Sequence, residues 1–210
     1  NNILSSPYAE EIRQFFEPLY NTLKVFQDIM EEWITCQRGW IYLESIFSAP
    51  DIQKQLPSDY KKFSNVDNNF KTLMFDTNEF PRVLKVLQKK PKLLDELRRD
   101  NTVIEQIQKS LEDYLEEKRR IFPRFFFLSN DELLEILATK SPQAVQPHLR
   151  KCFENVYELD FGGNPDVRSD DIFAMISNEK EKVKFFSRVK ARDNVENWLG
   201  MVEKEMIKAL

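Results

Sequence analysis

The sequence predicts a mainly α-helical fold: stacked helical bundles with long helices, and a small antiparallel β-hairpin or sheet in the C-terminal half. Three observations lead to this prediction. Apolar residues recur at alternating three- and four-residue steps through most of the first 121 residues. The chain has only 4 glycines among 210 residues, which is typical of a chain built mostly from regular structure. After residue 156 the apolar period shortens to two residues, the period of a strand.

The N-terminal stretch predicts one long helix with an apolar seam. Ser6 and Pro7 form a helix start, because serine caps a helix and proline suits its first position. Pro18 either kinks the helix or marks its true start. The seam contains Trp and Phe where homomeric coiled coils prefer Leu, Ile or Val, so a bundle helix is favoured. It comprises Ile12, Phe16, Leu19, Leu23, Phe26, Met30, Trp33, Cys36, Trp40, Leu43 and Phe47.

A corner from Phe47 to Pro57 leads to three further predicted helices. The second helix runs from Asp59 to about Phe75 and carries Phe63, Val66, Phe70 and Leu73 at helical spacing. A shorter one opens at Phe80-Pro81 and continues through Val83, Leu84 and Leu87. The next reaches Arg120 and carries Leu94, Leu97, Asn101, Ile104, Gln108, Leu111 and Leu115. The charge run from Glu116 to Arg120 is interpreted as a solvated helix end.

The junction from Phe122 to Leu137 ends one helix and begins another. Pro123 stops the incoming helix, and the run from Phe125 to Leu128 favours a buried strand, because it is short, aromatic and bounded by helix breakers. Its Phe residues are expected in the core. Ser129 and Glu132 form a capping box, so the next helix is predicted to begin at Asn130.

The remaining sequence predicts one more helix, a small sheet and a final helix. Ser141-Pro142 begins or prefaces a helix that carries Leu149, Cys152, Phe153 and Val156, with Pro147 inside its first turn or at its real start. The alternation from Tyr157 to Phe161 predicts a strand, and residues 172–177 and 182–189 predict a hairpin that turns at 178–181. With residues 125–128 these strands can form one sheet. Asp193 or Asn194 caps the last helix.

Composition excludes several classes of partner. The net charge is −4, with 31 basic and 35 acidic side chains that are interspersed, so no nucleic-acid partner is expected. No run approaches the ~20 apolar residues of a membrane span, so no membrane partner is expected either. Cys36 and Cys152 are predicted to be reduced cytosolic thiols. The apolar helical pattern continues to Leu210, which indicates a piece excised from a larger chain.

Motifs for nucleotide or metal chemistry are not apparent in the sequence. A phosphate-binding loop needs a glycine-rich turn before Lys and Ser or Thr, whereas Lys109-Ser110 and Lys140-Ser141 lack such glycines. Cys36 and Cys152 have no ligand spacing and lie on apolar stripes, so each is interpreted as a small buried hydrophobe.

Acid–base and nucleophilic catalysis are equally unsupported. His148 is the only histidine, and its place at a helix start favours a capping or surface role. The carboxylate pairs Asp170-Asp171 and Glu31-Glu32 have ordinary polar surroundings. We therefore predict no catalytic, cofactor-binding or metal-binding residue in this chain, and no enzymatic activity of its own.

Several motifs together resemble the linker of dynein heavy chains. They occur in the same order as in the family and cover roughly Trp33 to Leu210. The sequence Phe127-Leu128-Ser129 is similar to that of the axonemal members. One departure lies in the hairpin, where the family usually has a glycine near Lys180, so the turn type and the hairpin length are in question. The matching stretches are Trp33 to Phe47, Val66 to Met74, Ile107 to Arg119, Phe122 to Leu137, Val145 to Asn155 and Val195 to Leu199.

The resemblance implies a mechanical function. In this family the linker is a curved stack of helical bundles across the AAA+ ring, and it bends and straightens as the ring binds and hydrolyses ATP. The implied partners are the AAA+ ring of the same heavy chain and, indirectly, microtubules and other dynein subunits. ATP and Mg would be bound by AAA+ modules elsewhere in the full-length chain. The implied location is the cytoplasm and cytoskeleton, in the axoneme of a cilium.

Within such a linker the chain is expected to form one continuous elongated unit with two parts. Residues 1–121 would be the long-helix bundle part, and residues 122–210 the part with a helix and a small sheet. The corner from Phe47 to Pro57 and the junction from Phe122 to Ser129 are expected joints, because both contain proline. The alternative is a non-catalytic helical cytoskeletal scaffold or adaptor domain of spectrin-like type, which predicts internal repeats and no sheet.

Overall fold

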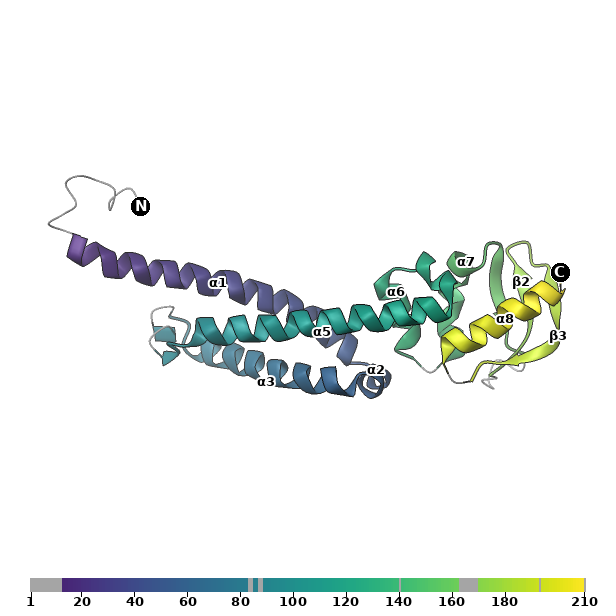
Figure 1. Cartoon of the computed structure of the whole chain (residues 1–210), viewed down its shortest axis with the longest axis horizontal. Coiled ribbons are helices and arrows are strands. Elements are labelled where there is room, and N and C mark those ends of the chain that lie inside the picture. Colours follow the sequence, from purple (N-terminus) through teal and green to yellow (C-terminus); the bar gives the residue numbers. More distant parts are fainter. Residues whose placement is uncertain are drawn as a thin grey trace. The chain divides into compact units, whose positions relative to one another are not determined.

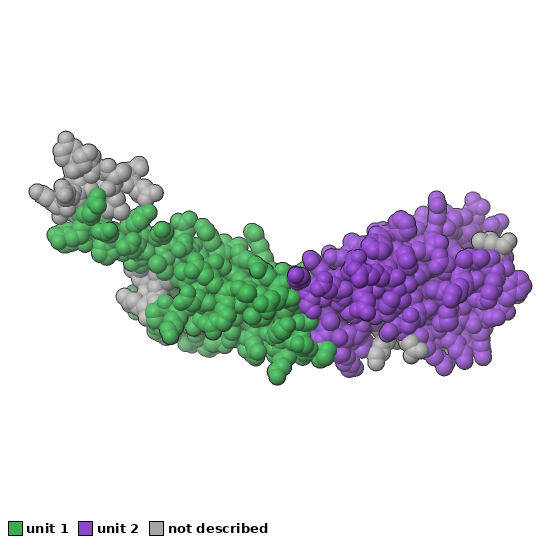
Figure 2. Space-filling model, viewed as in Figure 1, with its two compact units in different colours: residues 1–45, 57–108 green, residues 46–56, 109–210 purple. Residues whose placement is uncertain are grey.

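The computed structural model describes residues 13–82, 85–86, 89–139, 141–162, 170–192 and 194–209. The chain forms two compact units: unit 1 is Asn1–Ser45 with Pro57–Gln108, and unit 2 is Ile46–Leu56 with Lys109–Leu210 (Figure 2). Long helices and a three-stranded antiparallel sheet in the C-terminal half confirm the predicted fold class. The units divide the chain elsewhere than the boundary expected after residue 121, and that division into linker parts stays a prediction.

Unit 1 is a helical bundle made by α1 (Arg13–Phe47), α3 (Pro57–Glu79) and the first part of α5 (Leu93–Ile121) (Figure 1). Aromatic rings join the helices, since Trp40 lies 5.0 Å from Phe70 between ring centroids and its indole donates to Asp67 Oδ1 at 2.9 Å. The predicted seams supply the core, in which Cys36, Leu43, Phe63, Val66, Phe70, Leu73, Leu97 and Ile104 are buried.

The long N-terminal helix agrees with its prediction in extent but differs in burial. Pro18 lies inside α1, which begins at Arg13 and continues to Phe47, so Pro18 does not mark the start of the helix. The apolar seam is buried only in its second half, because Leu19 and Leu23 are 52% and 55% exposed while Cys36 and Leu43 are fully buried. The predicted start at Ser6-Pro7 lies outside the described residues.

The corners contain more helix than the sequence pattern indicated. The short helix α2 (Pro50–Gln55) fills the corner between Phe47 and Pro57, with proline at its start and Ile52 fully buried. Next, α3 begins at Pro57, two residues before the predicted start. Residues Val83, Leu84 and Leu87 of the predicted short helix lie outside the described part of the chain.

The aromatic junction is helical, so the predicted strand at Phe125 to Leu128 is wrong. Pro123–Phe127 forms the 3-10 helix η1, closed by a bond of 3.0 Å from the Phe125 N–H to the Phe122 carbonyl. The three-residue period of such a helix explains the exposure pattern. Phe122, Phe125 and Leu128 are buried, whereas Phe126 and Phe127 are 58% and 67% exposed, so the expectation that all these Phe side chains lie in the core is also wrong.

The helices after the junction follow local capping and proline signals. Helix α6 (Asn130–Leu137) begins at the predicted residue, and both bonds of the Ser129–Glu132 capping box are present. The helix predicted from Ser141-Pro142 is instead the 3-10 helix η2 (Pro142–His148), followed by the one-turn α7 (Leu149–Cys152). Pro147 explains this, because it cannot donate the backbone bond that an α-helix needs there.

The sheet confirms the three strands predicted after residue 156. Its strands β1 (Val156–Asp160), β2 (Asp171–Ser177) and β3 (Lys182–Lys190) pair antiparallel in the order β1-β2-β3, with Ile172 opposite Val189. Residues 125–128 take no part in it. Helix α8 (Val195–Ala209) packs against β3, and Trp198 and Leu199 are buried. Asn194 precedes α8 and accepts the Asn197 N–H at 3.0 Å, whereas Asp193 is not described.

Both expected joints contribute buried residues to the core of unit 2, although Pro57, at the end of the first corner, belongs to unit 1. Phe47 and Ile52 are 3% and 0% exposed in the first corner, and Phe122 and Phe125 are 1% and 0% exposed in the second. A hinge needs a segment that can change its backbone angles without breaking close packing. The chain passes from one unit to the other at both ends of the first corner, at residues 45–46 and 56–57, so the hypothesis that the two corners are joints stays a prediction.

Candidate functional site: a cavity in unit 2

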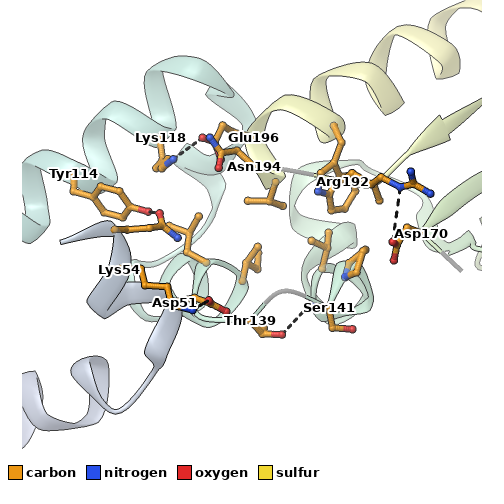
Figure 3. Close-up of a pocket in the computed structure, with 18 residues that line it drawn as sticks. Asp51, Lys54, Tyr114, Lys118, Thr139, Ser141, Asp170, Arg192, Asn194 and Glu196 are labelled. Atoms are coloured by element: carbon orange, nitrogen blue, oxygen red, sulfur yellow. Dashed lines mark hydrogen bonds and ion pairs between the residues drawn. The ribbon is translucent and has the colours of Figure 1, made fainter. Parts of the chain in front are cut away.

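Unit 2 contains a cavity of about 810 Å³ that five of its helices help to line (Figure 3). Its walls come from α2, the end of α5, the end of α6, η2 and the start of α8, so segments far apart in the sequence meet here. The lining residues are Asp51, Lys54, Gln55, Tyr114, Lys118, Ile136, Leu137, Thr139, Ser141, Pro142, Val145, Asp170, Ala191, Arg192, Asn194, Val195, Glu196 and Trp198.

A buried ion pair is the main charged feature of the cavity. The ammonium of Lys118 on α5 lies 2.5 Å from Glu196 Oε1 on α8, and their side chains are 11% and 1% exposed. Lys118 belongs to the charge run from Glu116 to Arg120 that the sequence predicted to be solvated, but it is only 9% exposed, so that prediction is wrong at this residue. Glu196 lies in the first turn of α8, where the helix dipole favours a carboxylate.

The second oxygen of this carboxylate is unsatisfied. Glu196 Oε2 is buried and has no hydrogen-bond partner among the described residues. Buried polar atoms are nearly always hydrogen-bonded, because leaving one unpaired costs about 1–3 kcal/mol. Glu196 Oε2 is thus an unpaired acceptor enclosed in the interior of unit 2, next to the ion pair with Lys118.

Tyr114 gives the cavity a neutral polar wall. Its hydroxyl donates to Gln55 Oε1, and its ring lies 5.2 Å from the Lys118 ammonium. Burial, followed by the charges of Glu196 and Glu117, raises the pKa of Tyr114 above its ordinary value of 10.0. The phenol therefore stays protonated near neutral pH and acts as a donor rather than a base.

Charges at the rim are paired with one another. Arg192 lies 3.9 Å from Asp170, and Lys54 lies 3.7 Å from Asp51. With the pair of Lys118 and Glu196, the lining residues that the structure describes include three basic and three acidic side chains in matched pairs. This arrangement can bind a polar group by hydrogen bonds, and it does not favour a ligand of one net charge.

The candidates weighed from sequence are scattered rather than brought together. Asp170 and Ser141 line the cavity, whereas Asp171 bonds with Arg188 at 3.0 Å and Lys140 is outside the described residues. Glu32 belongs to unit 1, where it accepts from Asn101 Nδ2 at 2.7 Å.

The expectation of a capping or surface role for His148 is wrong. The residue precedes α7 but makes no side-chain cap, and it is 7% exposed. The 3-10 turn of η2 brings its ring against α6, where Nε2 lies 3.2 Å from Glu135 Oε2 and Nδ1 lies 3.9 Å from Glu132 Oε1. His148 does not line the cavity.

Both cysteines are buried small side chains, as the sequence predicts. Burial raises the pKa of Cys36 to about 12 and that of Cys152 to about 11. Across the residues that the structure describes, no three His, Cys, Asp or Glu side chains come together in a way that could hold a metal ion. Within the same residues, no helix combines the length and apolar character needed to span a bilayer.

The apolar pattern of α5 indicates that Lys118 is buried, but the charged residues around Lys118 obscure this indication. Lys118 continues the buried stripe of Leu111, Leu115 and Phe122 at steps of four, three and four residues. A lysine on the buried stripe of a helix needs a partner, because an unpaired buried charge is very costly. The position, rather than the residue type, identifies Lys118 as a site residue.

The family model and the individual relatives that match this chain all belong to one family. The family model described as Dynein heavy chain, N-terminal region 2, matches residues 1–210. Dynein axonemal heavy chain 6 of Homo sapiens is 48% identical over 223 residues, which cover 99% of this chain and 5% of that relative. Dynein axonemal heavy chain 3 of Mus musculus is 44% identical over 213 residues, covering 100% of this chain and 5% of the relative.

A third relative, Dynein axonemal heavy chain 1 of Homo sapiens, is 44% identical over 206 residues, covering 98% of this chain and again 5% of its own length. The chain thus spans about a twentieth of these relatives, and the family model accounts for all of its residues. On this evidence the chain belongs to the dynein heavy chain family, in which it matches N-terminal region 2.

Proposed function

We propose that this chain is part of the mechanical linker of an axonemal dynein heavy chain. In this role it transmits ATP-driven changes of the AAA+ ring to the tail and so contributes to microtubule-based movement of cilia. The observation that carries the proposal is the family match over residues 1–210, because it covers the whole chain and agrees with relatives that are named as axonemal dynein heavy chains.

The physical character of each unit supports a mechanical role. The 29-residue helix α5 carries a buried stripe along its length, and the 35-residue helix α1 carries one in its second half. Unit 2 packs Phe122 against Phe125 with ring centroids 4.9 Å apart, and both are almost fully buried. Close-packed interiors of this kind have low compressibility and transmit force with little deformation.

In this role, ATP binding and hydrolysis take place in other parts of the heavy chain. The AAA+ ring of the same chain is the direct partner, and it binds ATP and Mg. Microtubules and other dynein subunits are reached indirectly, and the working location is the cytoskeleton of the cytoplasm and ciliary axoneme. The chain itself needs no cofactor and catalyses no reaction. A spectrin-like scaffold is disfavoured, because that alternative predicts no sheet and β1, β2 and β3 are present.

A distance measurement in the full-length motor tests the proposal. A fluorescent amino acid replaces the exposed Lys61 of α3, and a second fluorophore is placed in the AAA+ ring. The transfer efficiency between them should change when a non-hydrolysable ATP analogue replaces the nucleotide-free state. A control pair at Lys24 and Lys61, both in unit 1, should give a constant efficiency.

Two results would count against the proposal. An unchanged efficiency between Lys61 and the ring in every nucleotide state would indicate a static scaffold. ATP hydrolysis by the isolated 210-residue chain at the rate of a motor would show that the chain is an enzyme rather than a passive lever.

A further inference from the structure

We propose that an exposed stripe of α1 binds the same stripe in a second copy of this chain, as an antiparallel pair of helices. This stripe, called the outer stripe, lies wholly in unit 1. The inference goes beyond the proposed function, because it concerns association between two chains and does not require that either chain act as a lever. The outer stripe consists of Phe16, Tyr20, Leu23, Gln27, Met30, Ile34, Gln37 and Ile41.

The outer stripe has the spacing of a coiled-coil interface. Its members follow one another at alternating steps of four and three residues from Phe16 to Ile41. This stretch contains 26 residues, which is more than three heptads, and it measures about 39 Å at about 1.5 Å per residue. A heptad pattern sustained over this length is typical of a helix that pairs with another helix along its side.

The outer stripe is distinct from the side of α1 that the core of unit 1 uses. On the core side, Ile29, Cys36 and Leu43 are 4%, 0% and 0% exposed, whereas Leu23 and Ile41 of the outer stripe are 55% and 53% exposed. At about 100° per residue, the two sides lie roughly 150° apart around the helix axis. Helix α1 is thus apolar on two sides, and unit 1 buries only one of them. The outer stripe also exposes Phe16, Met30 and Ile34.

Charged residues beside the outer stripe indicate the orientation of the pair. Glu17, Lys24, Glu31 and Arg38 are exposed, stand seven residues apart and alternate in sign. A hydrogen bond of 2.9 Å from Gln27 Nε2 to Glu31 Oε1 links this row to the stripe. In an antiparallel pair, Glu17 of one copy lies opposite Arg38 of the other, and Lys24 lies opposite Glu31. The row is therefore complementary to itself, as a two-fold symmetric interface requires.

The two ends of the outer stripe agree with this orientation. Arg13 and Glu44 occupy the next positions of the same pattern, three residues before Phe16 and three after Ile41. Antiparallel pairing puts Arg13 opposite Glu44 and Phe16 opposite Ile41. Parallel pairing would instead put each of these charges opposite the same charge, which is unfavourable. The other opposed positions of the antiparallel pair are Tyr20 with Gln37, Leu23 with Ile34 and Gln27 with Met30.

The tryptophans that disfavour a homomeric coiled coil are not part of the outer stripe. Trp33 and Trp40 both pack on Phe70 inside unit 1, with ring centroids 6.5 and 5.0 Å apart. The outer stripe contains Gln27 and Gln37, and polar residues at such positions fix the register of a helix pair at a cost in stability. We therefore expect a weak dimer with a single register.

Sedimentation equilibrium of the 210-residue chain tests the association. Its average mass should rise towards that of a dimer as the concentration increases. Leu23→Glu with Ile34→Glu puts unpaired carboxylates into opposed layers and should weaken association at least tenfold. Met74→Glu with Ile207→Glu is the control, because these side chains are 44% and 72% exposed and lie on other helices. A monomer at every concentration, or equal weakening by the control, would overturn the proposal.

A charge exchange tests the register, and it retains the apolar residues of the stripe. Lys24→Glu puts two carboxylates opposite each other twice in the symmetric pair, so association should weaken about threefold to tenfold. Adding Glu31→Lys should restore the association, because the opposed charges again differ in sign. A helix that is merely destabilised would not recover in this way. Association that stays weak in the double variant would overturn the proposed register.

Photo-cross-linking in the full-length heavy chain tests the occupant. A photoreactive phenylalanine analogue replaces Leu23, and chains of two isotope compositions are mixed so that links between chains are distinguished from links within one. The expected product joins position 23 of one heavy chain to the segment around Ile34 of another. A link between the two copies of position 23, to another protein or to another segment of the same chain would overturn the proposal. None of these measurements depends on nucleotide-driven motion, so their failure is distinguishable from failure of the lever proposal.

Discussion

Lys180 holds an unusual backbone angle in the turn between β2 and β3. Its φ is +67°, in the left-handed region that costs a residue with a side chain about 1 kcal/mol or more. The hairpin is closed by a bond of 2.9 Å from the Ser177 N–H to the Glu181 carbonyl. The position thus adopts the conformation that the family resemblance assigns to a glycine, although this chain has lysine there.

Lys180→Gly is expected to be more stable than Lys180→Ala by about 1 kcal/mol, because only glycine adopts this angle without strain. Comparing two variants that both lack the ammonium removes its contact with the Tyr157 ring, 5.2 Å away, from the result. Urea unfolding of both variants measures the difference. An alanine variant as stable as the glycine variant would show that the turn relaxes to another angle.

Gly39 and Gly200 both lie inside helices but have opposite surroundings. A Cβ at Gly39 would stand 2.6 Å from Ile104 Cγ2, whereas a Cβ at Gly200 meets nothing within 4 Å. Gly39→Ala should therefore destabilise unit 1 by about 1–3 kcal/mol through overpacking. Gly200→Ala should stabilise α8 by up to about 1 kcal/mol through helix propensity. Thermal unfolding of both variants tests this, and a Gly39→Ala variant as stable as the wild type would contradict it.

Individual side chains show where sequence reasoning reached its limit. Cys36 and Cys152 were placed correctly because they lie on clear apolar stripes. Phe126 and Phe127 were not, since an apolar run has no periodicity from which to distinguish a strand from a 3-10 turn. Lys118 and Glu196 lie 78 residues apart in the sequence, so their pairing depends on tertiary packing that no local pattern specifies.

At the scale of elements, local chemistry determined what could be predicted. The Ser129–Glu132 capping box and the two-residue alternation of the strands located α6 and the sheet almost to the residue. The helices that begin with or contain proline were harder to predict. Their residues Pro50, Pro142 and Pro147 are compatible with several kinds of turn or helix. The cavity lies among such elements, and for this reason it could not be predicted.

The capping box also predicts how stability depends on pH. Hydrogen bonds from the Lys151 ammonium and then from the Ser129 N–H lower the pKa of Glu132 from 4.5 to about 2. A lowered carboxyl pKa contributes stability above 4.5, and this contribution is lost as the pH falls from 4.5 towards about 2. The stability advantage of the wild type over Glu132→Gln should therefore shrink across that interval.

Urea unfolding between pH 5 and pH 2 measures this advantage for wild type and Glu132→Gln. Lys151→Met removes the largest cause of the shift, since the ammonium lies 2.6 Å from Glu132 Oε1. An NMR titration should then find the Glu132 pKa closer to 4.5 in that variant. An advantage that stays constant from pH 5 to pH 2 would show that Glu132 is not stabilised in its charged form.

At the scale of the whole molecule, the two units share helix α5. Helix α5 supplies Leu97 and Ile104 to unit 1 and Leu111 and Leu115 to unit 2, and all four are buried. The corner at residues 46–56 likewise belongs to unit 2, although the elements on both sides of it belong mainly to unit 1. Neither assignment follows from sequence order, which explains why the units differ from the division expected at residue 121.

The shared helix predicts that the units unfold together. Cys36 reports on unit 1 and Cys152 on unit 2, and a buried thiol with a raised pKa reacts only when its surroundings open. Because helix formation is cooperative, loss of packing on one part of α5 weakens the other part. Labelling of the two thiols at increasing urea, analysed by mass spectrometry, should therefore give coincident midpoints.

A proline at the unit boundary tests whether α5 is the cause of this coupling. Gln108→Pro interrupts the helix at the last residue of unit 1, with a local cost of about 3 kcal/mol, and Gln108→Ala is the control that keeps it intact. The midpoints of Cys36 and Cys152 should separate in the proline variant and stay together in the alanine variant. Separate midpoints in the wild type would mean that each unit is stable alone, whereas coincident midpoints in the proline variant would place the coupling outside α5.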